Sequence, residues 1–255
     1  MSQRETTGTG LDADDAFVGL VDFGLFAEKI PPCFTSEGLA AKLPAAMEKV
    51  AYETDSEKLG KLIAKQTRGY IRYQTLRDTN IPRQLGIPHP QSYFAQCNSI
   101  WRCWESIKKH CAKPTQPISR IFVRDTGTDR VFVMNYKGQE RFEVEEQEIN
   151  FATGACCVVH ADISTCFPSI YTHSIPWALH SRKKAKKSRG DLSLEGNMLD
   201  KATQAVRDGQ TNGLLIGPHA SNVIAELVLT SVDAALLRKG HTRVTRHIDD
   251  YRFYA

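Results

Sequence analysis

Two adjacent carboxylates near the end of the sequence are the residues best suited to chemistry. Asp249 and Asp250 lie between two short runs of β-branched and aromatic residues, 244–248 and 251–254. Such runs are typical of strands, so the pair is expected at the tight turn of a β-hairpin. Like charges side by side repel, and a divalent cation such as Mg²⁺ would stabilise them. A solvated Asp-Asp turn explains the same pattern, because turns favour Asp.

A third carboxylate, Asp162, follows an apolar run of strand length over residues 156–161. A turn and a helix opened by Pro168 are expected after it. A helix-capping role is the alternative for an Asp at such a turn. One carboxylate at a strand end and two on a hairpin are the minimum for holding two metal ions. Asp162, Asp249 and Asp250 are therefore the candidate catalytic and metal-binding residues.

Three segments carry these residues in a specific order. They are Asp162-x-x-x-x-Phe167, Ile216-Gly217-Pro218-x-x-Ser221 and Asp249-Asp250-Tyr251. The order and spacing resemble the palm of reverse transcriptases, and more narrowly the bacterial abortive-infection and defence-associated branch. Further upstream, Ile-Pro-His-Pro at 87–90 is similar to the fingers of that branch.

The resemblance implies an α+β fold with right-hand polymerase fingers and a partial palm of ferredoxin-like core, without a thumb. It divides the chain into a disordered tail (1–16), an N-terminal extension with fingers (17–155) and a partial palm (156–255). Within the palm, residues 180–212 are expected to be a basic insertion. The missing thumb leaves two alternatives: the sequence is a fragment, or a partner chain or a homo-oligomer supplies the thumb.

The resemblance also implies an activity, that of an RNA-directed DNA polymerase, or DNA nucleotidyltransferase, in antiviral (phage) defence. The enzyme would add dNTPs with two Mg²⁺ ions, or Mn²⁺, on an RNA or DNA partner. Protein-primed and weakly templated synthesis both stay open in this branch. The backbone carbonyl of Ile163 is the expected additional metal ligand.

Nucleotide contacts follow from the same resemblance. Phe167 stands at the position of the sugar gate, where it would clash with a 2′ hydroxyl and favour deoxynucleotides. Where many reverse transcriptases have Pro-Gln-Gly, this chain has Leu215-Ile216-Gly217, and the defence branch commonly has Ile there. The fingers hairpin would place cations on the triphosphate. The candidate cations are Arg120, Arg124 and Lys137.

Basic residues in two other segments are candidates for nucleic-acid contacts. The first segment, 56–77, interleaves cations with aromatic residues, and Arg72 and Arg77 are its candidates. The second is a dense run between two palm motifs. Its candidates are Arg182, Lys183, Lys184, Lys186, Lys187 and Arg189. The alternative for each segment is a solvated basic surface.

Composition sets the broad class. The chain has 255 residues, 41% hydrophobic and 24% charged content and a net charge of +4, ordinary values for a globular protein. Its seven cysteines form no C-x-x-C pair, which favours thiols in a reducing compartment over disulfides or zinc. No apolar run approaches membrane-spanning length, so we expect a soluble, cytoplasmic protein without a membrane partner.

Periodicity predicts the elements around these motifs. Apolar residues recur at helical spacing over 56–77, and a helix over 91–110 carries a stripe that includes Tyr93, Cys97 and Trp104 and is expected in the core. Alternating segments over 118–136 predict a hairpin. A nearly all-apolar stretch over 223–237 predicts a buried helix.

Two other functions compete with the polymerase. One is a catalytically incomplete, polymerase-like module for nucleic-acid binding or assembly. The other is a different palm-type enzyme, such as an RNA-dependent RNA polymerase. Phe167 disfavours the latter, because that enzyme must admit a 2′ hydroxyl.

Overall fold

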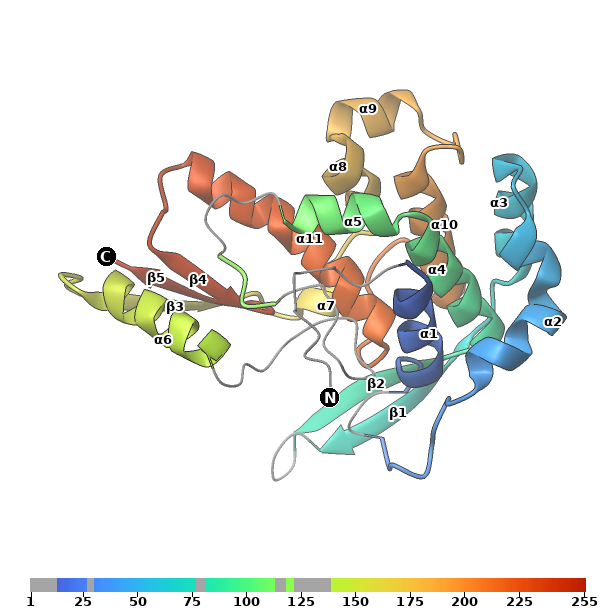
Figure 1. Cartoon of the computed structure of the whole chain (residues 1–255), viewed down its shortest axis with the longest axis horizontal. Helices are drawn as coiled ribbons and strands as arrows, with labels where there is room; N and C mark the ends of the chain where they lie inside the picture. The colour runs from blue at the N-terminus through green and yellow to red at the C-terminus, as the bar shows by residue number, and fades with distance from the viewer. Residues whose placement is uncertain (1–12, 27–29, 77–80, 113–117, 122–138) are drawn as a thin grey trace, which may run out of the picture.

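The computed structural model describes residues 13–26, 30–76, 81–112, 118–121 and 139–255. Over these ranges the chain mixes helices and strands, in agreement with the expected α+β class. Most helices gather at one end of the molecule and a three-stranded sheet forms the other end (Figure 1). Helix α11 (His219–Arg238) runs from the helical end toward the sheet (Figure 1).

The elements are bounded as follows. In chain order, the other described helices are α1 (Ala13–Phe23), α2 (Leu39–Tyr52), α3 (Ser56–Lys65), α4 (Pro90–Arg102), α5 (Trp104–Cys111), α6 (Gln139–Ala152), α7 (Cys166–Ser169), α8 (Ser174–His180), α9 (Arg182–Lys187) and α10 (Glu195–Val206). The described strands are β1 (Tyr70–Leu76), β2 (Pro82–Pro88), β3 (Val158–Asp162), β4 (Val244–His247) and β5 (Asp250–Tyr254). Strands β1 and β2 form an antiparallel hairpin, and the others form an antiparallel sheet of order β3-β5-β4.

The helical core forms around α4, α5 and α11. The helix predicted over 91–110 is two helices, α4 and α5, which meet at Cys103. Pro90 begins α4, and the imidazole of His89 accepts a hydrogen bond from the Gln91 amide at 3.3 Å. The predicted stripe is confirmed as core, because Tyr93, Cys97 and Trp104 are fully buried.

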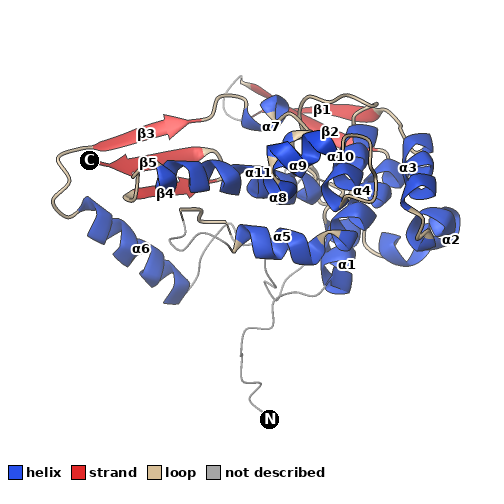
Figure 2. Cartoon of the chain, turned by 90° about the horizontal axis from the view of Figure 1, so that it is seen from above, coloured by secondary structure: helices blue, strands red, loops and turns tan. Residues whose placement is uncertain are grey.

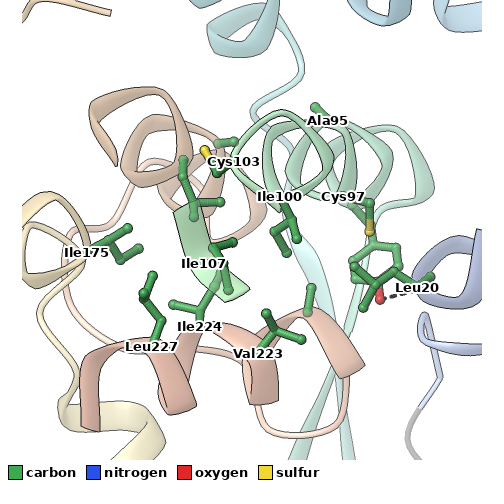
Figure 3. Close-up of a cluster of buried hydrophobic side chains, with 14 of the residues drawn as sticks. Leu20, Ala95, Cys97, Ile100, Cys103, Ile107, Ile175, Val223, Ile224 and Leu227 are labelled. Atoms are coloured by element: carbon green, nitrogen blue, oxygen red, sulfur yellow. Dashed lines mark hydrogen bonds between the residues drawn. The ribbon is translucent and has the colours of Figure 1, made fainter. Parts of the chain in front are cut away.

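Helix α11 contributes the other half of this core. Figure 3 shows Val223, Ile224 and Leu227 of α11 beside Ile107 of α5 and Ile175 of α8. The buried helix predicted over 223–237 is thus confirmed. By length and composition α11 could cross a membrane, but 56% of it is buried inside the protein, as in an ordinary core helix.

The helix predicted over 56–77 is wrong in its second half. Asp55 caps α3 by accepting a hydrogen bond from the Lys58 amide at 2.8 Å, and α3 ends at Lys65. The residues of β1 instead pair with β2, Tyr70 opposite Pro88. Tyr, Ile and Thr favour a strand there, and the antiparallel partner decides the conformation.

The apolar run before Asp162 predicts a core strand, but β3 is an exposed edge strand. Among the described strands it pairs with β5 alone, and Val158 and Val159 remain 41% and 50% exposed. The adjacent thiols of Cys156 and Cys157 are exposed too. Helix α11 packs on one face of this sheet, and α6 lies at the other face, where Arg252 contacts Glu148 at 3.3 Å (Figure 2).

Two predicted boundaries change. Helix α1 begins at Ala13, inside the segment 1–16 expected to be disordered, and Ala16 is fully buried. The basic insertion expected over 180–212 divides into the exposed helix α9 and the core helix α10, whose Leu199 and Ala202 are fully buried. The hairpin predicted over 118–136 lies mostly outside the described residues.

Candidate active site

The hairpin of β4 and β5 presents the acidic pair as predicted. His247 pairs with Asp250, so Ile248 and Asp249 form a two-residue turn. Ile248 has a φ of 59°, a conformation that β-branched residues rarely adopt. Such strain persists only where the surroundings hold the backbone in place, and it is common at functional sites.

A buried ion network holds this turn. Arg246 of β4 is fully buried, and its guanidinium contacts Glu226 at 2.9 Å and Asp233 at 2.7 Å, both on α11. Arg246 also donates a hydrogen bond to the carbonyl of Ile248 at 2.9 Å, and the Tyr251 hydroxyl donates to Asp233 at 2.9 Å. The network therefore fixes the turn, on which Asp249 lies, to the core helix α11.

Charge explains why Arg246 stays ionised there. Burial alone would lower the pKa of its guanidinium, but the charge of Glu226 and the hydrogen bonds to Asp233 outweigh burial and raise it. An isolated buried charge would be very unfavourable, and bidentate contacts with two carboxylates compensate it.

The structure brings all three predicted catalytic residues to one end of the sheet. Asp162, the last residue of β3, lies directly opposite Asp250, the first residue of β5. The amide of Ile163 donates to the carbonyl of Asp249 at 3.2 Å, which joins β3 to the turn. Asp162 and Asp250 are exposed and Asp249 is half-buried. Two segments almost ninety residues apart in the sequence thus meet at this point.

The negative charges act on one another here. Burial raises the pKa of Asp249, its own backbone hydrogen bond lowers it, and the charges of Asp162 and Asp250 raise it further. The net shift is upward, although Arg83 of β2 opposes it. A bound cation would remove this repulsion, and carboxylate oxygens are the ligands that Mg²⁺ prefers.

The oxygen atoms at this end of the sheet suit a hard divalent cation that is shared with a substrate. Within the described ranges, no group of three or more His, Cys, Asp or Glu side chains is placed to hold a metal ion, so Asp162, Asp249 and Asp250 do not form a three-carboxylate site by themselves. Mg²⁺ is usually held by one or two carboxylates, with water and substrate phosphates completing its shell, so this arrangement fits it. The carbonyl of Ile163, a predicted ligand, accepts a hydrogen bond from the Cys166 amide at 3.1 Å and keeps a second lone pair.

Of the predicted nucleotide-binding residues, Phe167 follows Asp162 by five residues, and Ile216 and Gly217 lie in the loop before α11. Phe167 lies on α7, and its carbonyl accepts a hydrogen bond from the Leu214 amide at 2.7 Å. The carbonyl of Ile216 accepts from Gly86 of β2 at 2.9 Å, and Gly217 has a φ of 129°. A small cavity is lined by Phe167, by Ile248 of the turn and by residues of α11.

The predicted triphosphate cations are only partly placed. Arg124 and Lys137 lie outside the described residues. Arg120 is buried and donates a hydrogen bond to Gln147 at 2.6 Å, so it is not an exposed fingers cation. Arg120 does line a cavity of about 500 Å³ between the sheet and α6, together with Asp162 and Asp250.

The predicted nucleic-acid-binding residues that the structure describes lie on β1 and on or just after α9. Arg72 is exposed on β1 with its guanidinium 5.8 Å from the ring centre of Tyr70, and Arg77 lies outside the described residues. The candidates of the second segment are all exposed, on α9 or just after it. They are Arg182, Lys183, Lys184, Lys186, Lys187 and Arg189.

Sequence reasoning missed the residues that position the acidic turn. Glu226 and Asp233 interrupt an otherwise apolar helix, and they lie seven residues apart, on one face. Buried acids require a buried cation, so this spacing was a signal for a partner such as Arg246. Arg83 and Cys166 gave no such signal. The Cys166 thiol has a pKa raised to about 11 by burial and by the charge of Asp249.

Comparison of the chain with models of protein families gives no match. Comparison with curated proteins gives no match either.

Proposed function

We propose that the chain is a reverse-transcriptase-type nucleotidyltransferase that adds deoxynucleotides at the site formed by Asp162, Asp249 and Asp250. The observation that carries the proposal is the direct pairing of Asp162 with Asp250 across β3 and β5. Together with Asp249, these residues put three carboxylates from two distant segments at one exposed end of the sheet. A structural turn has no need of the third carboxylate.

The proposal assigns a role to each neighbouring residue. Asp162 and Asp249 hold the metal ions, and Asp250 supports them. Two Mg²⁺ ions, once bound, lower the pKa of the attacking hydroxyl and stabilise negative charge at the α-phosphorus. Phe167, on the helix that follows Asp162, contacts the sugar of the dNTP and excludes a 2′ hydroxyl. The backbone around Ile216 and Gly217 contacts the nucleotide from the other side.

The wider proposal is that this activity serves antiviral defence and acts with RNA or DNA. The three palm-like motifs of the sequence support it, because the structure joins the segments that carry them through the hydrogen bonds of Leu214 with Phe167 and of Ile163 with Asp249. The fingers and palm assignment and the reducing cytoplasmic setting belong to the same proposal.

The test is incorporation of labelled dNTPs in Mg²⁺ by the purified chain and by an Asp249→Ala, Asp250→Ala double variant. A matched control is Glu37→Ala, Glu48→Ala, which removes two exposed carboxylates elsewhere. We expect label incorporation by the wild type and by the control, and none by the Asp variant. Equal incorporation by both double variants contradicts the proposal. A wild type that binds nucleic acid without incorporating label supports the binding module instead.

A further inference from the structure

An aromatic cluster lies on the surface that follows α7. Tyr171 is 39% exposed, and its ring meets the ring of His173 edge-on, with centroids 4.7 Å apart. The ring of Trp177 lies 5.8 Å from that of Tyr171, also edge-on. The guanidinium of Arg182 stands 5.1 Å from the ring centre of Trp177. Aromatic rings and a stacked guanidinium are thus gathered in one partly exposed patch.

The patch continues into the most basic element of the chain. Five of the six residues of α9 are Lys or Arg, and Ala185 is the one that is buried. Cations one turn apart repel, and across the part of the chain that the structure describes none of the five forms an ion pair. A polyanion would relieve this repulsion. We call the aromatic patch and α9 together the α8–α9 surface.

Hydrogen bonds to α10 and to the segment around Thr211 hold the aromatic patch in place. His173 is hydrogen-bonded to Asp200 of α10 at 2.5 Å, and Gln204 donates to the same carboxylate at 2.7 Å. Next to Tyr171, the amide of Thr172 donates to the carbonyl of Thr211 at 2.8 Å. A ring that is already ordered loses little conformational entropy when a ligand stacks on it.

We propose that the α8–α9 surface binds single-stranded nucleic acid. Its parts are those that such binding uses: aromatic rings on which bases stack, and cations along the backbone. A duplex keeps its bases paired inside the helix and offers them to no ring, so the aromatic half of the surface favours a single strand. An acidic peptide would match α9, but it would leave the exposed Tyr171 without a stacking partner.

The α8–α9 surface shares no residue with the acidic turn, but it follows Asp162 closely in the sequence. Tyr171 follows Phe167 by four residues, and Asp162 precedes Tyr171 by nine. Nine residues span at most about 30 Å, which is the upper bound on the separation of Tyr171 and Asp162. This binding needs neither metal nor nucleotide, and it goes beyond the proposed transferase activity.

The test is fluorescence anisotropy with labelled oligo(dT), oligo(U) and a duplex of equal length, in EDTA and without nucleotide. We expect the wild type to prefer the single strands. Removing the ring on which one base stacks weakens binding about 5- to 160-fold, so Tyr171→Ala should weaken it by that factor, and Tyr171→Phe should not. Arg182→Gln provides a second variant should Tyr171→Ala fail to fold, and it should weaken binding several-fold.

The charges of α9 are tested by salt dependence. A variant with Gln at Lys183, Lys184, Lys186 and Lys187 should flatten the slope of log affinity against log salt by about 0.7 for each phosphate that the protein no longer neutralises. The matched control removes four exposed lysines from other parts of the surface. It is Lys42→Gln, Lys49→Gln, Lys109→Gln, Lys239→Gln, and it should keep the slope.

Three results would overturn the proposal: equal affinity for duplex and single strand, wild-type binding by both Tyr171→Ala and Arg182→Gln, or equal flattening of the slope by the two lysine variants. The Asp249→Ala, Asp250→Ala variant should bind as the wild type does in EDTA. Failure of the transferase proposal therefore leaves this one standing, and the reverse is also true.

Discussion

The acidic residues around the β4–β5 hairpin fall into two groups with opposite electrostatics. Behind the hairpin, Glu226 and Asp233 are buried and share the guanidinium of Arg246. At its turn, Asp162, Asp249 and Asp250 lie together at an exposed edge, where Arg83 gives only a small opposing effect on Asp249.

The comparison separates the residues that position the turn from the residues available for chemistry. The buried group is compensated by Arg246 and ties the turn to α11, so its role is to hold the backbone. At the turn, the charges of Asp162 and Asp250 raise the pKa of Asp249, an unfavourable interaction that stabilises nothing by itself. Uncompensated charge that the fold holds in a fixed position is a common property of functional sites. Three predictions sharpen this contrast.

The largest effect is expected from Arg246→Met. This change keeps most of the side-chain volume but leaves Glu226 and Asp233 buried without a cation, which should lower the free energy of unfolding by about 3–5 kcal/mol. Denaturant unfolding measures it. Arg252→Met is the matched control on the same hairpin, where the contact with Glu148 is exposed and worth at most about 1 kcal/mol. Equal losses of stability in the two variants would remove the distinction between the two groups.

A second effect is expected in the reactivity of Cys166, which lies beside the acidic turn. Its pKa is raised to about 11 from an ordinary value of 9.0, first by burial and then by the charge of Asp249. That shift lowers the thiolate fraction near pH 8 about 100-fold. Mass spectrometry after brief alkylation should find the exposed Cys156 modified and Cys166 intact. Equal labelling of both would contradict the burial and the raised pKa of Cys166.

The smallest effect is expected from Asp249→Asn. The pKa of Asp249 is raised in the folded state, so its ionised form destabilises the protein. The Asn variant should therefore melt at a higher temperature at neutral pH. This gain should vanish below about pH 3.8, where the carboxyl is protonated in both states, and should grow as the pH rises through the folded pKa.

The matched control for this prediction is Asp191→Asn. Hydrogen bonds from Ser193 lower the pKa of Asp191, so the sign reverses and the variant should gain nothing at neutral pH. A melting temperature that falls with Asp249→Asn would show that the acidic turn is compensated after all.

The parts of the site that depend on local sequence were predictable. Runs of β-branched residues located β3 and the hairpin, and apolar content located α11. The strand β1 was missed because the helical spacing of α3 was extended through it, whereas pairing with β2 decides its conformation. Exposure of β3 was missed because an apolar run does not reveal how many strands or helices will cover it.

The residues that position the acidic turn were harder to predict than the three carboxylates on it and beside it. Arg246 is close to the acidic pair in sequence, yet its partners lie on α11, and only the packed fold shows that it is buried. Likewise, the hydrogen bond of Gly86 with Ile216 joins β2 to the loop before α11, far away in the sequence. Tertiary placement of this kind has no local signal.

The central claim is that the acidic turn binds divalent metal. Its most direct test is titration of Mn²⁺ into the purified chain, with bound ion measured by electron paramagnetic resonance, for the wild type and for Asp162→Asn, Asp249→Asn. We predict that the wild type binds Mn²⁺, that Mg²⁺ displaces it, and that the variant loses this binding. Superimposable titration curves for the two proteins would contradict the account.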